Sequence, residues 1–319
     1  MAKNIINHSN QKYWIPVLSI LFILISTVIY FGFIRNLNKS MPSSNSETSV
    51  IYTTFYPLEF ITKQITGNTF EVVNITPLGT EPHDFEPSAK TLIRLNSAKA
   101  FVFLGKEIDP WAEKKSENLK QLGVLTVAVK DKINLEKIQE TDQQIQDPHF
   151  WLNPKLVSQF SQKLSNELSQ KFPEKSEVFK SNLLKFQDRL NTLDIQTSLA
   201  LSSCKQRKII VAHDAYSYFA KEYNLEVVPI SGLSPEEEPS VQKIAEIIDI
   251  VKANKINYIF LENTANPKIT EVISSATGAK SLELNPIESL TEEQIKNGQD
   301  YFTVHQNNTK NIKIALNCV

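Results

Sequence analysis

The chain contains little glycine, and several common functional motifs are missing from it. Only 8 of its 319 residues are glycine, and none belongs to a GxGxxG or GxxxxGK[ST] loop of the kind that cradles phosphate groups. The zinc-enzyme motif HExxH is also absent. Nucleotide-dependent enzymes are therefore disfavoured, whereas the missing HExxH excludes only one class of zinc enzyme.

Neither sign of charge is in excess. The 34 Lys and Arg residues face 35 Asp and Glu residues, for a formal net charge of −1. A nucleic-acid partner would call for a basic surplus, so we expect none. Hydrophobic residues make up 41% of the chain, an ordinary globular proportion, and the length suits two domains of about 130 residues each.

One long apolar run stands near the N-terminus. Residues 14–34 carry no charge, and at about 1.5 Å per residue a helix of this length spans the roughly 30 Å hydrocarbon core. A cleaved signal peptide has a shorter apolar region and a small-residue cleavage site. We therefore expect an uncleaved transmembrane anchor, with an N-terminal tail at 1–13 and a flexible, Ser-rich tether at 35–48. A cleaved signal is the alternative.

Cysteine is scarce too. Cys204 and Cys318 are the two cysteines of the chain. In a cytosolic protein they would most simply be free thiols, whereas in an exported protein an even count favours a disulfide. We expect the disulfide, which would fix the C-terminus to the start of the second half.

Predicted strands and helices alternate along the chain. In the first half, strands are expected at 50–55, 70–75, 100–104 and 124–129, and helices at 56–66, 88–97 and 111–122. The second half repeats the pattern with strands at 208–212, 225–230, 258–261 and 280–284, and helices at 216–223, 241–253, 267–277 and 301–316. Such alternation predicts an α/β fold with parallel sheets. The polar residues 130–146 are expected to form a loop.

A long helix is predicted between the two halves. After a helix at 154–171, residues 173–201 contain no internal glycine or proline, and their apolar positions are spaced by four, three, four and three residues. This helix would be about 40 Å long. A bundle helix is the ordinary interpretation, but its position favours a rigid connection between two lobes. The predicted domains are an N-terminal lobe at 49–172, a linking helix at 173–203 and a C-terminal lobe at 204–319.

Three of the five histidines occupy equivalent positions. His83, His149 and His213 each lie at or just beyond the end of a strand or loop and before a helix, and prolines flank the first two. In open α/β lobes, ligands bind beyond the carboxyl ends of the strands, where these histidines can meet. A lone histidine is more often a surface or hydrogen-bonded core residue. Three equivalent ones favour a metal site, because neutral imidazole is the commonest metal ligand.

Ligand type alone does not separate a metal carrier from an enzyme. Three histidines and one oxygen ligand form a tetrahedral Zn²⁺ site, and catalytic zinc uses the same three histidines with a bound water. A zinc hydrolase would also need a general base, for which Asp84, Asp214 and Glu262 are the candidates. The remaining histidines, His8 and His305, are expected to be solvated.

Six segments resemble those of a known family. They occur in the same order as in the metal-binding receptors (solute-binding proteins, cluster A-I) of zinc and manganese ABC transporters, and the resemblance covers about residues 50–319. The segments are GTEPHDFEPS (79–88), DPHFWLNP (147–154), AHDAYSYFAKEYNL (212–225), GLSPEEEPS (232–240), IFLENTANPK (259–268) and LNPIESLTEEQIKNGQDYF (284–302). The resemblance implies two β/α lobes joined by one long rigid helix, with the metal in the cleft between the lobes.

The resemblance also implies the ligands. It makes His83, His149 and His213 the three imidazole ligands. In the manganese branch the third ligand is a carboxylate, which suits a harder ion, so His213 favours Zn²⁺ over Mn²⁺. Many zinc members have a histidine-rich loop between the first two ligands, but residues 106–147 of this chain contain no histidine.

The fourth ligand is less directly implied. Manganese members carry an aspartate where this chain has Asn285, and zinc members with a similar segment suggest Glu288 instead. Water, Glu283 and Glu262 are the alternatives. The ordinary interpretation of Glu288 is an acidic residue near the N-terminus of the next helix.

The sequence therefore predicts a receptor rather than an enzyme. It would be a monomer held on the extracytoplasmic face of the membrane by residues 14–34, with its N-terminus inside, and it would pass Zn²⁺ to an ABC permease. The alternatives are a manganese receptor of the same family, a zinc-dependent hydrolase, and an adhesin that uses metal only structurally.

Overall fold

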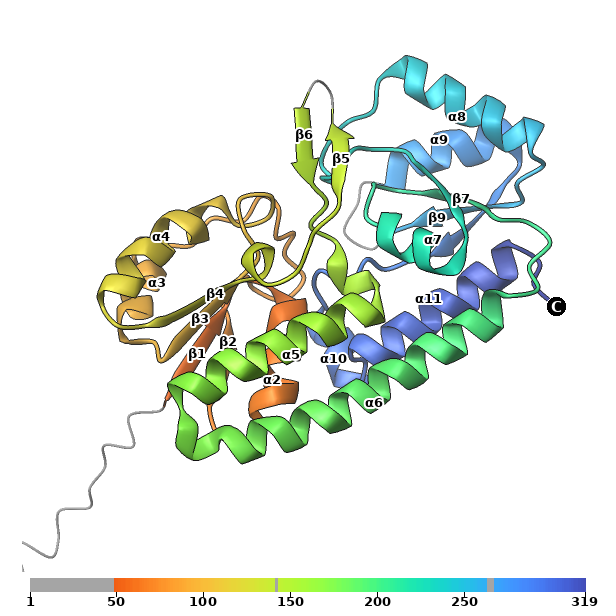
Figure 1. Cartoon of the computed structure of the whole chain (residues 1–319). Helices are drawn as coiled ribbons and strands as arrows, with labels where there is room; N and C mark the ends of the chain where they lie inside the picture. The colour runs from red at the N-terminus through yellow and green to blue at the C-terminus, as the bar shows by residue number, and fades with distance from the viewer. Residues whose placement is uncertain (1–48, 141–142, 263–266) are drawn as a thin grey trace, which may run out of the picture. The chain divides into compact units, whose positions relative to one another are not determined.

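A four-stranded parallel sheet organises the first half of the fold (Figure 1). The computed structural model describes residues 49–140, 143–262 and 267–319. The strands lie in the order β2-β1-β3-β4, and their bounds are β1 (Val50–Thr53), β2 (Glu71–Asn74), β3 (Ala100–Phe103) and β4 (Leu125–Ala128). The register pairs Ile51 with both Val72 and Ala100. The intervening helices are α2 (Tyr56–Thr66), α3 (Ala89–Arg94) with the 3₁₀ turn η1 (Leu95–Ser97), and α4 (Pro110–Gln121).

Parallel strand pairs also organise the second half. Strand β7 (Lys208–Val211) pairs with β8 (Glu226–Pro229), β9 (Tyr258–Leu261) pairs with β10 (Lys280–Glu283), and β7 contacts β9. The helices here are α7 (Ser217–Tyr223), α8 (Val241–Ala253) and α9 (Pro267–Thr277). The predicted α/β fold with parallel sheets is therefore confirmed.

Strand β3 is buried on both faces of the first sheet, which explains its continuous apolar sequence. Every residue of β3 is buried. Ala100 and Val102 face the main core, while Phe101 and Phe103 face a second cluster that includes Leu119 of α4. A third cluster lies around Ile210, Ile247 and Ile259 in the second half.

The long helix α6 (Ser176–Leu201) confirms the prediction for this part of the chain (Figure 1). It has 26 residues and packs against α2, α5 (Pro154–Lys171) and α11 (Tyr301–Ala315). The apolar residues that predicted it are all buried: Phe179, Leu183, Phe186, Leu190 and Leu193. Pro173 opens a 3₁₀ turn, η4 (Pro173–Lys175), so the α-helix begins at Ser176.

Two expectations were wrong. The stretch expected to be a loop contains the 3₁₀ turn η2 (Val129–Asp131) and an antiparallel hairpin of β5 (Lys137–Glu140) and β6 (Gln143–Gln146). Its strands are too polar to show the alternation that marks a half-buried strand. His305, expected in solvent, is 1% exposed, and its Nε2–H donates to the Leu152 carbonyl at 3.2 Å. Burial lowers the pKa of His305 to about 4, so its imidazole stays neutral.

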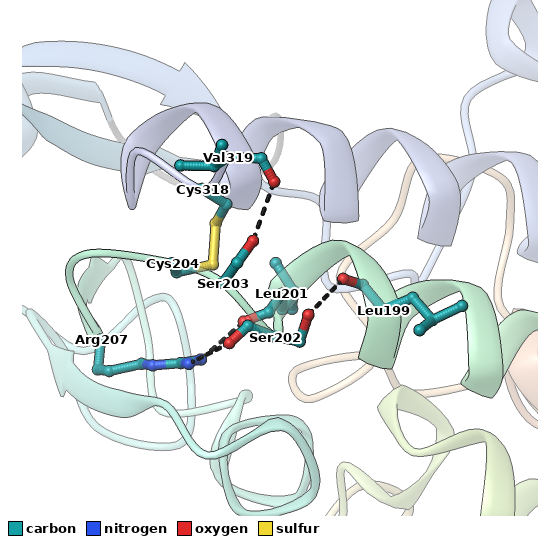
Figure 2. The surroundings of a disulfide bond; sticks show 8 residues. All are labelled: Leu199, Leu201, Ser202, Ser203, Cys204, Arg207, Cys318 and Val319. Atoms are coloured by element: carbon teal, nitrogen blue, oxygen red, sulfur yellow. Dashed lines mark hydrogen bonds between the residues drawn. A yellow bond between two sulfur atoms is a disulfide. The ribbon is translucent and has the colours of Figure 1, made fainter.

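The expected disulfide is confirmed (Figure 2). Cys204 follows α6, and Cys318 follows α11, so the bond joins the ends of two packed helices. Around it, the Arg207 guanidinium donates to the carbonyls of Leu201 and Ser202 at 2.7 and 2.9 Å. These are carbonyls at the end of α6, which have no partner within the helix itself.

The predicted tail, anchor and tether, residues 1–48, lie outside the described residues, as does His8. Within the described ranges, no helix is long and apolar enough to cross a membrane.

Candidate metal centre

Three histidines and one glutamate converge within residues 49–319, which form one compact unit. His83, His149, His213 and Glu288 each offer a ligand atom, and these four atoms lie within 4.8 Å of one another. Oε1 of Glu288 lies 3.3 Å from Nε2 of His149, 3.3 Å from Nε2 of His213 and 3.8 Å from Nε2 of His83. The structure thus brings together the four residues that the sequence singled out.

Local structure explains how each side chain reaches this point. His213 lies two residues after the end of β7, and Glu288 lies in the turn after β10, so both are beyond the carboxyl ends of their strands. His149 precedes the 3₁₀ turn η3 (Phe150–Leu152). His83 lies in the loop after β2, where Gly79 has φ 72°, a conformation that glycine adopts readily. The Gly79 N–H donates to Ser289 Oγ at 2.8 Å, so this loop contacts the residue next to Glu288.

The converging atoms are buried and lack hydrogen bonds. His149 and His213 are fully buried, and Glu288 is 3% exposed. Nε2 of each of the three histidines and both carboxylate oxygens of Glu288 have no hydrogen-bond partner in the described part of the chain. Buried polar atoms are almost always hydrogen-bonded, because leaving them unpaired is costly. Five such atoms around one point are therefore the arrangement expected of a cation site.

Two further carboxylates orient the imidazoles of His149 and His213 by contacting Nδ1, the ring nitrogen away from the centre. Oδ1 of Asp147 lies 2.9 Å from Nδ1 of His149, and both oxygens of Glu262 lie 2.8 Å from Nδ1 of His213. A carboxylate at Nδ1 places the proton there and leaves the Nε2 lone pair directed at the centre. Sequence reasoning missed Asp147, although it stands two residues before His149 in the same motif.

The charges at the centre shift the pKa values of Glu288 and His213 in opposite directions. Burial alone would raise the pKa of Glu288, but the charge of His213 and the approach of the three imidazoles lower it well below its ordinary range. Burial alone would lower the pKa of His213, but the charges of Glu262 and Glu288 raise it well above its ordinary value. Burial alone would also lower the pKa of His149, but Asp147 and Glu288 raise it, whereas burial lowers the pKa of His83. Without metal, His149 and His213 therefore hold their protons up to a higher pH than an ordinary histidine, beside a carboxyl group that loses its proton more readily than an ordinary glutamate.

Glu81 is a second residue that sequence reasoning missed. Burial, followed by the charge of Glu288, raises the pKa of Glu81 to about 9. Its Oε1 accepts from the backbone N–H of His83 at 3.3 Å. At neutral pH Glu81 is therefore protonated and adds no second negative charge beside Glu288.

The remaining candidates lie outside the group of four. Glu283 ends β10 with an exposed side chain, and Asn285 accepts from the Ile287 N–H at 2.7 Å. Of the candidate general bases, Asp84 is exposed, and Asp214 accepts from Ser217 Oγ at 3.2 Å. The third, Glu262, directs both oxygens at His213.

The chain belongs to the family described as "Zinc-uptake complex component A periplasmic", which matches residues 51–315. This confirms the resemblance found in the sequence. The description names a component of zinc uptake, in agreement with the prediction of a receptor rather than an enzyme.

Similar proteins agree with this assignment. The zinc-binding lipoprotein AdcA of Streptococcus pneumoniae is 36% identical over 274 residues, which are 82% of this chain and 55% of that protein. The chain thus spans about half the length of the curated relatives it matches. The Zn(II)-bound ZnuA-like domain of that AdcA superposes with a TM-score of 0.74 at 36% identity, covering 84% of this chain and 99% of the domain.

A third similar structure is that of an adhesin. The laminin-binding protein Lmb of Streptococcus agalactiae is described as bifunctional, with adhesin and metal transporting activity. It has a TM-score of 0.76 at 27% identity and covers 84% of this chain and 99% of that one.

Proposed function

We propose that the chain is an extracytoplasmic receptor that binds Zn²⁺ through His83, His149, His213 and Glu288 and delivers it to an ABC permease. The observation that carries this proposal is the convergence of four residues whose facing ligand atoms are buried and have no hydrogen-bond partner among the described residues. Three nitrogen donors and one oxygen donor are a set that tetrahedral zinc accepts. Manganese prefers oxygen ligands, so Mn²⁺ is the less favoured ion.

The ligands come from both halves of the chain. His83 and His149 belong to residues 49–172, and His213 and Glu288 belong to residues 204–319, so we propose that the metal binds in a cleft between two lobes joined by residues 173–203. The contacts of α6 with helices of both halves support this division. One chain supplies all four ligands, which supports a monomer.

Location follows from the relatives and from the N-terminal sequence. The family description "periplasmic" and the relative named a lipoprotein support an extracytoplasmic site of action. We propose that residues 14–34 anchor the chain in the membrane with its N-terminus inside, because this run is uncharged and long enough to span it.

Metal analysis tests the proposal. The purified full-length chain, loaded with zinc and desalted, should retain about one zinc ion per chain, because one set of four ligands is present. His213→Ala should retain much less, whereas His305→Gln, a change at a buried histidine outside the centre, should retain as much as the wild type. A wild-type chain that retains no zinc would refute the proposed function.

Adhesion is the second candidate, and Lmb is the observation that favours it. An adhesin that uses metal only structurally should unfold when the metal is removed. The zinc receptor should stay folded without metal, because it must release its ion. Circular dichroism of the metal-free chain separates the two.

A further inference from the structure

The backbone that carries Glu288 adopts an unusual conformation. Ile287 has φ 63° and is fully buried. This left-handed region is unfavourable for a β-branched residue, since its Cβ substituents crowd the backbone. Such a residue keeps this conformation only where its surroundings fix it, and it often marks a functional site.

Two asparagines fix the turn from one side. The Asn285 side chain accepts from the Ile287 N–H at 2.7 Å. Asn308 of α11 holds the backbone of Asn285 at both ends, because its Oδ1 accepts from the Asn285 N–H at 3.0 Å and its Nδ2 donates to the Asn285 carbonyl at 2.6 Å. Asn285 therefore connects α11 to Ile287, the residue before Glu288.

Trp151 fixes the turn from the other side. Its Nε1–H donates to the carbonyl of Pro286 at 2.7 Å, and its side chain is fully buried. It lies two residues after His149, with the two ring centroids 5.1 Å apart. The Trp151 carbonyl accepts from Tyr301 Oη at 2.6 Å. Trp151 thus contacts His149 through its ring and the turn that carries Glu288 through its indole N–H.

We infer that Trp151 and Asn285 are positioning residues that hold the carboxylate of Glu288 against the three imidazoles. This inference rests on the proposed function. If either hydrogen bond to the 286–287 backbone is lost, the turn relaxes from its left-handed conformation and Glu288 withdraws from the centre. His149 and His213 keep Asp147 and Glu262 as partners at Nδ1, so zinc binding weakens but is not abolished.

Trp151→Phe tests this inference, because it removes the indole N–H and keeps an aromatic ring. Measured by competition with a chromophoric chelator, zinc affinity of the full-length chain should fall about tenfold, the usual effect of losing a partner that orients a ligand. The matched control is Trp111→Phe, a half-buried tryptophan of α4 that packs on Phe101. Its zinc affinity should be unchanged.

The deciding measurement repeats the change in a Glu288→Gln background. If Trp151 acts through Glu288, Trp151→Phe should there weaken zinc binding by less than about twofold, because coupled residues are not additive. An equal tenfold loss in both backgrounds would show a general packing effect and overturn the inference, as would no loss in either.

A second pair of variants keeps the test decisive if Trp151→Phe folds poorly. Asn285→Ala removes the acceptor for the Ile287 N–H and should weaken zinc binding about tenfold. Asn285→Ser keeps an uncharged acceptor for that N–H, adds no carboxylate, and should bind zinc within about threefold of the wild type. Equal losses in the two variants would contradict the inference. A wild-type chain without zinc affinity would instead refute the proposed function.

Discussion

Two buried carboxylates of this protein have opposite surroundings. Asp109 is 2% exposed and Glu288 is 3% exposed. Asp109 accepts hydrogen bonds from Thr54 Oγ at 2.5 Å, from the Leu104 N–H at 3.0 Å and from the Gly105 N–H at 2.7 Å. No hydrogen bond to either oxygen of Glu288 is found within the described residues.

The pKa values of the two groups diverge accordingly. Burial raises the pKa of Asp109 to about 6, in spite of its three hydrogen bonds. The pKa of Glu288 lies well below its ordinary range, because basic imidazoles surround it. Burial by itself therefore does not reveal the role of a carboxylate. Fixed N–H and O–H donors make Asp109 a structural brace, whereas partners that can exchange protons for a cation suit Glu288 to metal binding.

The largest effect is expected for Asp109, on the stability of the fold. Asp109→Ala leaves the Thr54 hydroxyl and the N–H groups of Leu104 and Gly105 without their acceptor. Since each unsatisfied buried donor costs about 1–3 kcal/mol, we expect the free energy of unfolding to fall by at least about 3 kcal/mol in urea titrations. Zinc affinity of the folded protein should stay within about threefold of the wild type. A loss of stability below about 1 kcal/mol would mean that Asp109 is not a brace.

The reverse pattern is expected at Glu288. Glu288→Gln removes the proposed anionic ligand, and zinc affinity should fall about 100-fold or more, since losing a residue that merely orients a ligand already costs 10- to 100-fold. Competition with a chelator measures this. An unchanged affinity would assign the fourth position to water or to another carboxylate.

Replacing a carboxylate that contacts Nδ1 of a histidine should have a smaller effect. Glu262→Gln removes the negative charge at Nδ1 of His213, and zinc affinity should fall between about 10- and 100-fold. Asp214→Asn is the matched control, because Asp214 neighbours His213 in sequence but lies outside the group of four. If both variants lost affinity equally, the special position of Glu262 would be in doubt.

Acid should weaken zinc binding by about tenfold per pH unit near neutrality, if one proton competes with the metal. Because the charges of Glu262 and Glu288 raise the pKa of His213, a proton competes with zinc for this imidazole up to a higher pH than it would at an ordinary histidine. Raising the pH removes this competitor, so affinity should increase from pH 5.5 to 7.5. Calorimetry in two buffers of different ionisation enthalpy should detect the release of about one proton. Affinity independent of pH would exclude imidazole ligands.

Much of the fold could be predicted because its signals are local. The apolar residues of α6 recur at helical spacing because they lie on its buried face, and the five positions predicted to be in the core are all buried. His305 shows where this reasoning fails. The buried face of α11 follows helical spacing, but it includes His305, Asn308 and Thr309, so a polar composition concealed a buried stripe.

The three histidines could also be identified from sequence, because prolines and strand ends mark their positions, whereas Glu288 was implied only by the resemblance to the family. Their supporting partners could not, since these are set by contacts between distant segments. Trp151 contacts Pro286, 135 residues away, and Glu262 contacts His213, 49 residues away. Nothing in the local sequence of Glu262 distinguishes a residue behind a ligand from a ligand itself.

X-ray absorption spectroscopy of the zinc-loaded chain tests the central claim most directly. We predict three imidazole nitrogens at about 2.0–2.1 Å and one carboxylate oxygen at about 2.0–2.2 Å from the metal. Glu288→Gln should keep the three nitrogens and lose the carboxylate. A wild-type spectrum with fewer than three imidazoles, or one that the Glu288→Gln change leaves unaltered, would contradict the account.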